Sequence, residues 1–553
     1  MGRRVYLETF GCQMNELDSE LVAGRLRALG YEFTGDSREA DVVLYNTCSV
    51  REQAEQKVWS RLGELRDEKS RRPEIVVGVL GCMAERDGVD LIRRMPVVDV
   101  MCGPGELDKL PDLLDNAVRT RESMLGDDDA RVRSARAVAL QGNTSRRSST
   151  LSAAQDNLEM LDLSRAVSPT DHSGSAYVRI TRGCNKFCTY CVVPFTRGAE
   201  VHRPPDNIVD EVKRLEQAGV REVTLLGQTV NHYRFEHGAA VALGGVTQPQ
   251  KGRSYRGGHS RDAFAGERVT TFADLLRRVH DEAPGIERLR FVTSYPRDFG
   301  DDALEAMRDS PRICRYLHVP AQSGSDEVLA RMNRGYTSGE YLDFLDRARA
   351  FLHQPEVGRP LMLAGDFIVG FPGESDEDFE KTVALVRRAR YKNCFVFKYS
   401  PRPGTIAYDR LNDDIPESVK RRRNNELLAV QSEISDEVGR EQVGREFDVM
   451  VEGVSRRALR QSGLTQGEIR RTGAVELTVA GRARGGAPLP DSQRDDEARD
   501  VVQLSSRTEG DLIVFFDAPR AISADLIGRT VRVRIGSAEH LSLHGVRVQQ
   551  GGE

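Results

Sequence analysis

Short apolar runs alternate with amphipathic segments over residues 3–118 of the chain. Runs of this kind are typical of buried strands, and apolar residues at helical spacing between them favour amphipathic helices. The expected strands cover 5–9, 41–47, 74–81 and 97–101, and the expected helices cover 15–29, 51–69 and 105–117. This βαβ order predicts a doubly wound parallel sheet with helices on both faces, in a domain of residues 1–119.

A second alternating region follows in residues 173–439. Its expected strands cover 176–181, 222–226, 289–293, 315–319, 363–369 and 394–399, with helices between them. Six βα units predict a partial (β/α) barrel, whose functional site lies at the carboxyl ends of the strands. A basic helix over 416–439 ends this domain. Short strands at 446–452, 501–505, 512–516 and 529–535 then predict a small OB-like β-barrel within 440–549.

Three segments interrupt these patterns. Residues 120–172 carry charge clusters and Ser, Thr and Gln, and we interpret them as a long, largely disordered linker. Residues 236–268 contain seven glycines with interspersed Lys and Arg, and residues 481–507 are rich in Gly, Arg and Asp. Both are expected to be surface loops inserted into domains.

Composition narrows the class of protein. A chain of 553 residues is too long for one core, so three or four domains are expected. A hydrophobic content of 39% with 30% charged residues is typical of a soluble globular protein. The start has no signal-peptide pattern and no run is long enough to span a bilayer, which predicts a cytoplasmic protein without a membrane partner. The net charge of -5 neither requires nor excludes a nucleic-acid partner.

Three of the nine cysteines form a close group. Cys184, Cys188 and Cys191 follow the first barrel strand with C-x3-C-x2-C spacing. Three thiolates bind three irons of a [4Fe–4S] cluster and leave the fourth iron open, where S-adenosylmethionine (SAM) can chelate. The alternative is a zinc knuckle, but structural zinc needs four ligands and no fourth lies nearby.

A second group of cysteines is spread along the first domain. Cys12, Cys48 and Cys82 each follow an expected strand of the same parallel sheet. Carboxyl ends of adjacent parallel strands face one crevice, so these three thiolates are candidates for a second cluster with one open iron. Any one of them alone is equally well a small buried hydrophobic residue. Cys102, Cys314 and Cys394 show no such pattern and are interpreted as core residues.

Longer motifs around these cysteines resemble the radical-SAM methylthiotransferase family. The similarity covers nearly everything except the three interruptions. It is carried by TFGCQMNELDSE (9–20), NTCSVRE (46–52), GCMAER (81–86), RGCNKFCTYCVVPFTRG (182–198), LLGQTVNHY (225–233), FVTSYP (291–296), LHVPAQSGSDEVLARMNRGYT (317–337), DFIVGFPGE (366–374) and YSPRPGT (399–405). Ala199 stands where an acidic residue is expected in such proteins.

The resemblance implies an architecture and a set of partners. An N-terminal methylthiotransferase domain, a radical-SAM core and a C-terminal RNA-binding TRAM domain are expected, with two [4Fe–4S] clusters and SAM as cofactors. The turns at Cys12 and Cys48 are similar to those of the branch that acts on N(6)-isopentenyladenosine next to the anticodon of tRNA. Other branches act on threonylcarbamoyl-adenosine or on a ribosomal protein. The implied partners are a tRNA anticodon stem-loop and an electron donor of flavodoxin or ferredoxin type, with the enzyme a monomer.

The same resemblance implies two uses of SAM. One molecule donates a methyl group to sulfur held at the N-terminal cluster, and another is cleaved at the second cluster to a 5′-deoxyadenosyl radical that activates carbon 2 of adenine. An aromatic C–H there is neither acidic nor readily attacked, so acid–base groups would not suffice. The alternatives are a non-catalytic iron–sulfur protein that binds RNA or senses redox state, and a zinc-ribbon scaffold.

Polar residues at barrel strand ends are candidates for SAM contacts. They are Tyr190, Gln228, Ser294, Gln322 and Asp366. Taken singly, each of these residues is equally consistent with an ordinary hydrogen bond in a turn or at a strand end. Candidate phosphate contacts are the run 420–423 together with Arg456, Arg457 and Arg460. For 420–423 the favoured interpretation is a solvated helix face.

Overall fold

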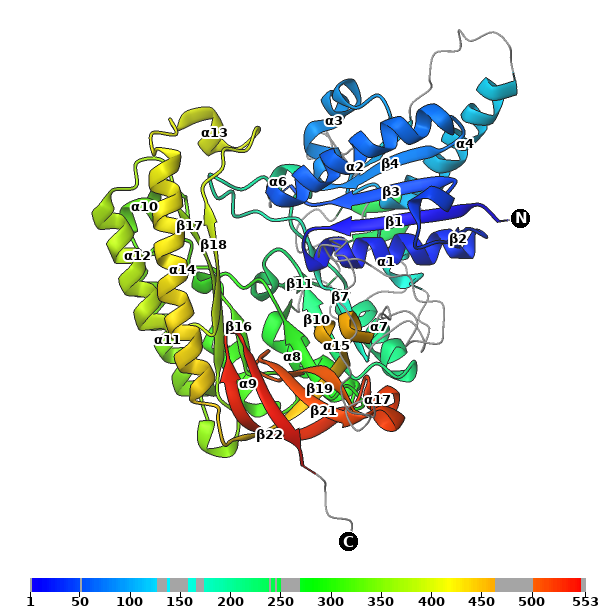
Figure 1. The fold of residues 1–553 in the computed structure, drawn as a ribbon. Coiled ribbons are helices and arrows are strands. Elements are labelled where there is room, and N and C mark those ends of the chain that lie inside the picture. The colour runs from blue at the N-terminus through cyan, green and yellow to red at the C-terminus, as the bar shows by residue number, and fades with distance from the viewer. Residues whose placement is uncertain are drawn as a thin grey trace, which may run out of the picture.

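The structure is a computed structural model that describes residues 2–49, 52–126, 137–139, 158–165, 174–237, 240–243, 246–249, 269–462 and 501–548. A parallel sheet with helices on both faces comes first, an open barrel follows, and a small closed barrel ends the chain (Figure 1). The predicted α/β fold class is therefore confirmed. None of the described helices is long and apolar enough to cross a membrane.

The N-terminal sheet has six parallel strands in the order β2-β1-β3-β4-β5-β6. Its central strands are buried on both faces because helices cover each side, as parallel sheets require. Val42 and Leu44 belong to the core on one face, and Val43 and Tyr45 to the core on the other. The strands are β1 (Arg4–Phe10), β2 (Glu32–Phe33), β3 (Val42–Thr47), β4 (Val76–Gly81), β5 (Val100–Cys102) and β6 (Ala137–Ala139).

Four helices cover this sheet, namely α1 (Gln13–Ala28), α2 (Glu52–Arg71), α3 (Cys82–Arg94) and α4 (Leu110–Gly126). Three of them match expected segments, although α4 begins five residues later than predicted. Helix α3 was not predicted because it begins directly at Cys82, without a linking loop. Gly81 makes this turn with φ 87°, a left-handed conformation that favours glycine.

The central domain is an open parallel barrel in which all six expected strands are present. They are β7 (Ser175–Arg179), β10 (Glu222–Leu226), β15 (Arg288–Phe291), β16 (Tyr316–His318), β17 (Met362–Val369) and β18 (Asn393–Lys398). A bridge between Leu289 and Ile313 joins the two halves. No pairing connects β7 with β18 among the described residues, so the barrel stays open.

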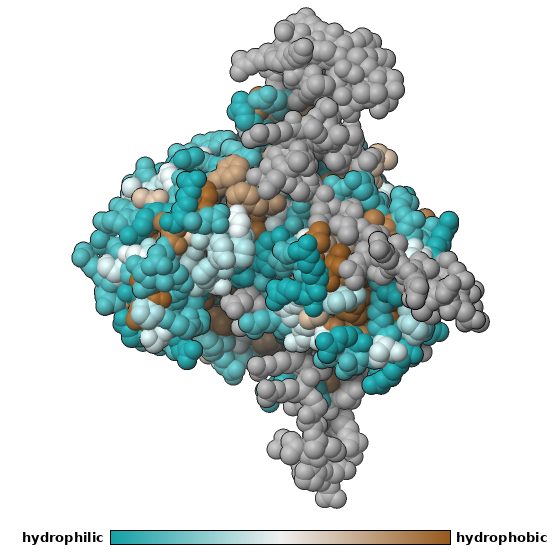
Figure 2. Space-filling model, turned by 90° about the horizontal axis from the view of Figure 1, so that it is seen from above, coloured by the Kyte–Doolittle hydropathy of each residue, from teal (hydrophilic) through white to brown (hydrophobic). Residues whose placement is uncertain are grey.

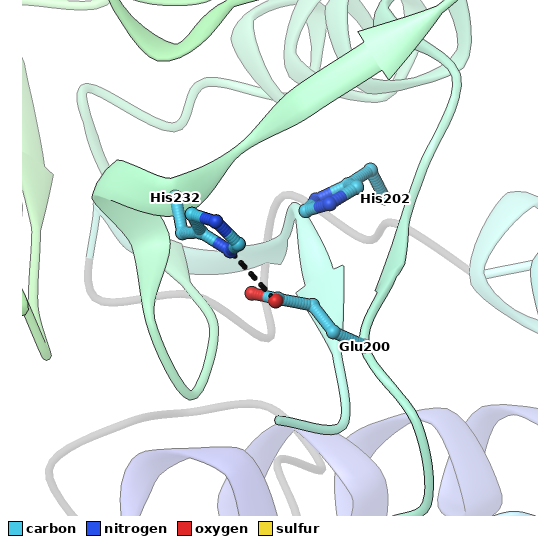
Figure 3. Close-up of side chains that lie close together, drawn as sticks. All are labelled: Glu200, His202 and His232. Atoms are coloured by element: carbon cyan, nitrogen blue, oxygen red, sulfur yellow. Dashed lines mark hydrogen bonds and ion pairs between the residues drawn. The ribbon is translucent and has the colours of Figure 1, made fainter. Parts of the chain in front are cut away.

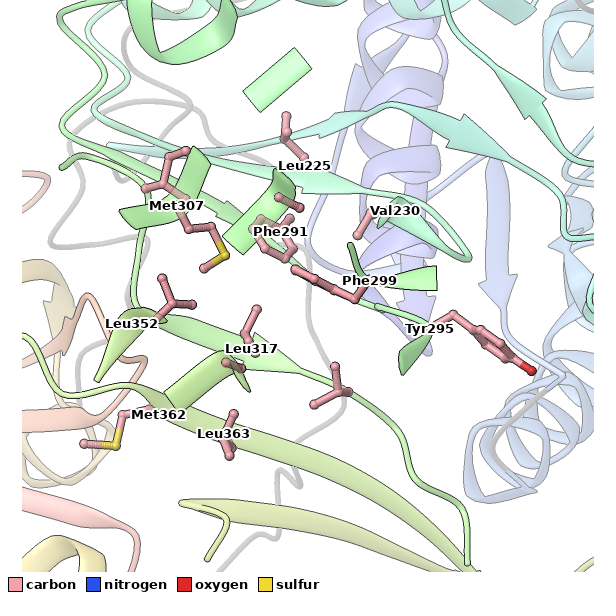
Figure 4. Packing of buried hydrophobic residues seen from close by; sticks show 14 of the residues in the cluster. Leu225, Val230, Phe291, Tyr295, Phe299, Met307, Leu317, Leu352, Met362 and Leu363 are labelled. Carbon is pink, nitrogen blue, oxygen red and sulfur yellow. The ribbon is translucent and has the colours of Figure 1, made fainter. Parts of the chain in front are cut away.

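The barrel core extends from these strands to the surrounding helices α7 (Pro205–Gln217), α8 (Phe272–Glu282), α9 (Asp301–Asp309), α11 (Ser338–Leu352), α12 (Asp376–Ala389) and α14 (Glu417–Arg440). Phe291 of β15 packs against Phe299, with ring centroids 6.1 Å apart. Leu317 and Leu363 come from the next two strands of the barrel (Figure 4). One continuous core therefore fixes the relative positions of the strand ends.

The C-terminal barrel is closed in the order β19-β20-β21-β23-β22. Its strands are β19 (Glu446–Val454), β20 (Val501–Thr508), β21 (Ile513–Pro519), β22 (Thr530–Glu539) and β23 (Ser542–Arg547). Strand β23 was not predicted. The expected insertion 481–507 is wrong at its end, because Val502 and Leu504 are buried alternate residues of β20. Residues 481–500 lie outside the described part.

The C-terminal barrel is held to the central one by buried cations. Arg288 and Arg290 of β15 donate to backbone carbonyls of β19, of β20 and of the turn that follows it. Lys392, just before β18, pairs with Asp511. Seen from above, hydrophilic residues predominate on the described surface, and hydrophobic ones show in small separate patches (Figure 2). Arg288, Arg290 and Lys392 thus join the two barrels through polar contacts, and Leu512 packs against the hydrophobic cores of both.

The expected insertion 236–268 is framed by paired strands. β11 (Arg234–Glu236) pairs antiparallel with β14 (Val269–Thr271), which brings the two ends of the segment together. Inside it, β12 (Ala240–Leu243) and β13 (Val246–Pro249) form a hairpin. The remainder of the segment, other than His237, lies outside the described residues.

Residues 158–165 correct the prediction of a linker over 120–172. They are ordered and carry buried charges that reach both neighbouring domains. Arg165 pairs with Glu20 of α1 and with Glu211 of α7, and Asp162 pairs with Arg179 and Arg182. This polar segment is ordered because it forms ion pairs with residues far away in the sequence. The composition of the segment itself carries no information about such partners. Residues 120–126 also end helix α4, and 137–139 form β6.

We expect Asp162→Ala to destabilise the protein by about 3–5 kcal/mol, because it leaves buried arginines without their counter-charge. Asp162 is 1% exposed. The matched control is Asp206→Ala, whose carboxylate is 73% exposed and pairs with Arg278 at the surface, for which about 0–1 kcal/mol is expected. Urea unfolding followed by circular dichroism measures the free energy of unfolding of both variants. Equal losses of this free energy would contradict the importance assigned to the buried ion pairs of Asp162.

Candidate active site

One cavity of about 730 Å³ runs through the barrel from the carboxyl ends of its strands, where Cys12 and Cys48 of the N-terminal domain line it, to the C-terminal barrel at the other end. Five of the six predicted cysteine ligands line it, namely Cys12, Cys48, Cys184, Cys188 and Cys191. All five predicted SAM contacts line it too: Tyr190, Gln228, Ser294, Gln322 and Asp366. Cys82 is not among the lining residues. All nine cysteines are described, and none forms a disulfide.

The barrel cysteines lie in a loop that starts at a two-stranded hairpin. β8 (Thr181–Arg182) pairs with β9 (Val201–His202), and Gly183 alone separates β8 from Cys184. Gly183 has φ 68°, and a Cβ there would overlap the carbonyl oxygen of Ala199. Burial raises the pKa of the Cys191 thiol, and the neighbouring Cys188 raises it further. The loop thus gathers three thiols at one point, with Cys188 buried and Cys184 and Cys191 partly exposed.

Arg334 stands beside this group. Its Nη1 donates to Sγ of Cys188 at 3.4 Å and to the hydroxyl of Tyr190 at 3.3 Å. The guanidinium lies over the ring of Tyr295, 4.7 Å from the centroid. A fixed buried cation next to a sulfur ligand stabilises the thiolate form. Sequence reasoning missed Arg334, although it lies inside the motif MNRGYT.

The N-terminal cysteines meet at the ends of β1, β3 and β4. A Cβ on Gly11, whose φ is 137°, would overlap the Cβ of Cys48, so the backbone before Cys12 passes very close to Cys48. A hydrogen bond with Cys48 lowers the pKa of Cys12 to about 6. Asn15 donates to Oδ1 of Asn46 at 3.0 Å, which ties the two turns together.

Cys82 lies behind the cavity wall, beside Arg197. Burial raises the pKa of Cys82, while the Arg197 guanidinium acts in the opposite direction. Arg197 comes from the barrel loop and also donates to Oδ2 of Asp18 at 2.9 Å. Its charge acts on Cys12 as well. One barrel arginine therefore contributes to the environment of the N-terminal cysteines, a role that the sequence did not indicate.

Four of the five predicted SAM contacts divide by whether their side chains already have a hydrogen-bond partner. Asp366 binds Nε2 of His318 at 3.1 Å, and Tyr190 accepts from Arg334. Oε1 of Gln228 and Oγ of Ser294 are buried without a hydrogen-bond partner. Buried polar atoms are rarely left unpaired in folded proteins. These two atoms therefore fit a polar ligand in the cavity.

Two exposed phenylalanines also line the cavity. Phe395 and Phe397 of β18 are 44% and 37% exposed, and their rings lie 6.4 Å apart at 16°. They occupy alternate positions on the edge strand of the open barrel, so their side chains share one face. The alternation in NCFVFK was available in the sequence, but it does not reveal which face is uncovered.

The candidate phosphate contacts differ in exposure. Lys420 and Arg423 are buried, pairing with Asp413 and Glu374. The interpretation of 420–423 as a solvated face is therefore wrong at these two residues, and neither is available to phosphate. Exposed arginines remain at Arg421, Arg422, Arg456, Arg457 and Arg460, the last three on α15 (Arg456–Ser462).

Comparison with known families agrees with this geometry. Residues 178–386 match the radical SAM superfamily, and residues 4–103 match the uncharacterized protein family UPF0004. The open barrel with its cysteine loop is thus that of a radical SAM protein.

Comparison with individual proteins narrows this class. A tRNA-2-methylthio-N(6)-dimethylallyladenosine synthase of Rhodopirellula baltica is 42% identical over 95% of this chain and 92% of its own length. A synthase of the same name from Burkholderia ambifaria is 37% identical over 99% of this chain and 97% of its own. The chain belongs to the family of these synthases.

A solved structure with a similar outline is distant in sequence. The radical S-adenosylmethionine methyltransferase TsrM from Kitasatospora setae, with cobalamin and a [4Fe-4S] cluster bound, has a TM-score of 0.45 and 15% identity. It covers 74% of this chain and 77% of its own.

We expect Gly11→Ala to disrupt the N-terminal cysteine group without unfolding the protein, because the added Cβ displaces Cys48. After anaerobic reconstitution with iron and sulfide, iron should fall from about eight to about four per chain. The matched control is Gly35→Ala, where nothing lies within 4 Å of the added atom. Unchanged iron in the Gly11 variant would show that this group holds no cluster.

Proposed function

We propose that this chain methylthiolates carbon 2 of N(6)-isopentenyladenosine next to the anticodon of tRNA, using SAM and two [4Fe–4S] clusters. The observation that carries the proposal is that cysteines from two separate domains line one cavity. The names of the relatives supply the substrate, a tRNA adenosine bearing a dimethylallyl group.

The cysteine chemistry fits two such clusters. Three thiols in each group, with no fourth cysteine beside them, suit a cluster that keeps one iron open. When bound, the two clusters supply the electron that cleaves SAM and the vacant iron that holds the sulfur. Arg334 and Arg197 each place a cation beside one group and stabilise its thiolates. The cavity brings the two groups to one substrate.

The pocket residues fit SAM at the barrel group. Gln228 and Ser294 offer buried polar atoms that lack partners, and SAM carries amino, carboxylate and ribose groups that can pair with them. Asp366 is held by His318, so its carboxylate orientation is set before any ligand arrives. Gln322, with φ 74°, lies in the segment after β16, and its amide donates to the carbonyl of Asp366 at 2.8 Å. These residues bind and orient SAM in the proposal.

The substrate base would enter along the open side of the barrel. Phe395 and Phe397 present ring faces there, and aromatic faces stack on unpaired bases. The closed C-terminal barrel, which we propose is a TRAM domain, carries the exposed arginines of α15 for phosphate contact. An anticodon loop suits this arrangement because its bases are single-stranded and can be turned outward.

Three further points extend the proposal. Cleavage of SAM needs a low-potential electron, so we propose a donor of flavodoxin or ferredoxin type. A single chain supplies both cysteine groups, which supports action as a monomer. A tRNA substrate, as named for the relatives, supports a cytoplasmic location.

We expect Ser294→Ala to weaken SAM binding without destabilising the protein. The hydroxyl has no internal partner to lose, and one lost hydrogen bond of about 1 kcal/mol raises Kd roughly fivefold. Equilibrium dialysis of the cluster-loaded protein measures the Kd for SAM. The control is Ser506→Ala, whose hydroxyl donates to the carbonyl of Val514 at 2.8 Å. That variant should lose stability and keep its SAM affinity. An unchanged Kd for the Ser294 variant would remove this serine from the SAM site.

We expect the two cysteine groups to separate by function. With dithionite, SAM and tRNA under anaerobic conditions, Cys184→Ala should form neither 5′-deoxyadenosine nor product. Cys48→Ala should still form 5′-deoxyadenosine but leave the tRNA without a methylthio group. Cys102→Ala, a buried cysteine of the same sheet, is the matched control and should retain both products. Full methylthiolation by the Cys48 variant would refute its assigned role.

The same assay tests the substrate. Digests of tRNA carrying N(6)-isopentenyladenosine should contain the methylthio product by mass spectrometry. Transfer of the methylthio group to threonylcarbamoyl-adenosine or to a ribosomal protein instead would show that the proposed substrate is wrong and that the chain acts on one of these alternatives. A wild-type protein that holds iron yet forms no 5′-deoxyadenosine would favour a non-catalytic iron–sulfur protein.

A further inference from the structure

Three potential metal ligands converge beside the loop that carries Cys184. Glu200 precedes β9, His202 ends β9, and His232 ends the turn η4 (Val230–His232) that follows β10. Their side chains point toward one another from these two segments (Figure 3). One ligand atom from each lies within 4.8 Å of the others. None of the three is a predicted cluster or SAM residue.

The internal hydrogen bonds of this group are incomplete. Nδ1 of His232 lies 2.7 Å from Oε2 of Glu200. The other carboxylate oxygen of Glu200 and Nδ1 of His202 are buried without hydrogen-bond partners. The Glu200 side chain is 1% exposed, and His232 is its only ion-pair partner among the described residues. A buried carboxylate with half of its acceptor capacity unused is costly unless a cation completes it.

We propose that Glu200, His202 and His232 bind one zinc ion. Two imidazole nitrogens and one carboxylate oxygen form a ligand set that zinc takes in proteins, with a water in the fourth position. His232 is 42% exposed, so the fourth position can face solvent on its side. Burial also lowers the pKa of His202, which keeps its imidazole neutral and able to bind a cation.

The geometry requires only a small rearrangement. Zinc bonds of about 2.0–2.2 Å place tetrahedral ligand atoms roughly 3.4 Å apart. A pair at the 4.8 Å limit would have to draw together by about 1.4 Å. Nδ1 of His232 and Oε2 of Glu200, now 2.7 Å apart, would instead exchange their hydrogen bond for bonds to the ion, and the partly exposed His232 can rotate to allow this. The ring of His202 packs edge-on against Tyr233, with centroids 5.6 Å apart, and is the fixed member of the set.

Zinc here would join the two segments that flank Cys184. On one side the amide of Cys184 donates to the carbonyl of Gly198, and the amide of Glu200 donates to Oδ1 of Asn185. On the other side Thr229, at the start of η4, lies 3.7 Å from Sγ of Cys184. The ion would thus hold the loop of the barrel cysteines between two fixed strand ends. This role is structural and does not depend on the proposed substrate.

The test is the zinc content of the full-length, cluster-loaded protein, incubated anaerobically with zinc chloride and desalted. We expect about one zinc per chain by plasma mass spectrometry, and at least a fivefold loss in both His202→Ala and His232→Ala. The control is His540→Ala, which removes another histidine paired with a carboxylate, that of Asp436, at the surface. That variant should bind zinc like the wild type. A wild type without zinc, or histidine variants that retain it, would overturn the proposal.

Zinc misplaced at the cysteine groups must be told apart from zinc at this site. X-ray absorption at the zinc edge does so, because nitrogen and oxygen ligands lie at about 2.0–2.1 Å and sulfur ligands at about 2.3 Å. A spectrum with only nitrogen and oxygen neighbours supports the site, and sulfur neighbours overturn it. His232 is partly exposed, so its variant should fold, and retained iron content checks this. If a histidine variant loses methylthiolation but still binds zinc, that loss concerns the proposed function and does not support the zinc site.

Discussion

The position of the two cysteine groups depends on one buried carboxylate, that of Asp18. This residue of α1 accepts from Arg179 of β7 through one oxygen and from Arg197 of the barrel loop through the other, each at 2.9 Å. Asp18 has no exposed surface. Buried charges are tolerated only when every partner is in place, so the two domains can dock in one register and not in shifted ones. Because the domains dock in this register, the strand ends of the N-terminal sheet and of the barrel face each other.

The buried charges of the framework are paired, whereas several buried polar atoms around the cysteine loops have no hydrogen-bond partner. The ion pairs of residues 158–165 and those that join the two barrels find their counter-charges within the protein. In contrast, Gln228, Ser294, Glu200 and His202 retain buried atoms with no partner. Burying such atoms is unfavourable unless a ligand pairs with them, which supports the ligand contacts proposed for these four residues.

The cavity environment also places cations beside two of the thiols proposed to bind iron. Cys188 receives a hydrogen bond from Arg334, and Cys12 lies within reach of Arg197 and Cys48. Both cations are held by other groups, Arg334 by tyrosine rings and a carbonyl and Arg197 by Asp18. They are therefore oriented before any cluster is present. A positive charge at a sulfur ligand is one of the levers by which a protein sets the potential of a cluster.

The sequence by itself determined the strands and the turns that follow them. Apolar runs located all six barrel strands, and the positions of Cys12, Cys48 and Cys82 after successive strands indicated that they would meet, because parallel strands end at one edge. These inferences are local. Only the tertiary structure decided that residues 158–165 are ordered, that Lys420 and Arg423 are buried, and that Phe395 and Phe397 are uncovered. It also paired Asp18 with residues 161 and 179 positions away. Periodicity reports which neighbours along the chain share a face, whereas counter-charges and covering surfaces come from distant segments that only folding brings together.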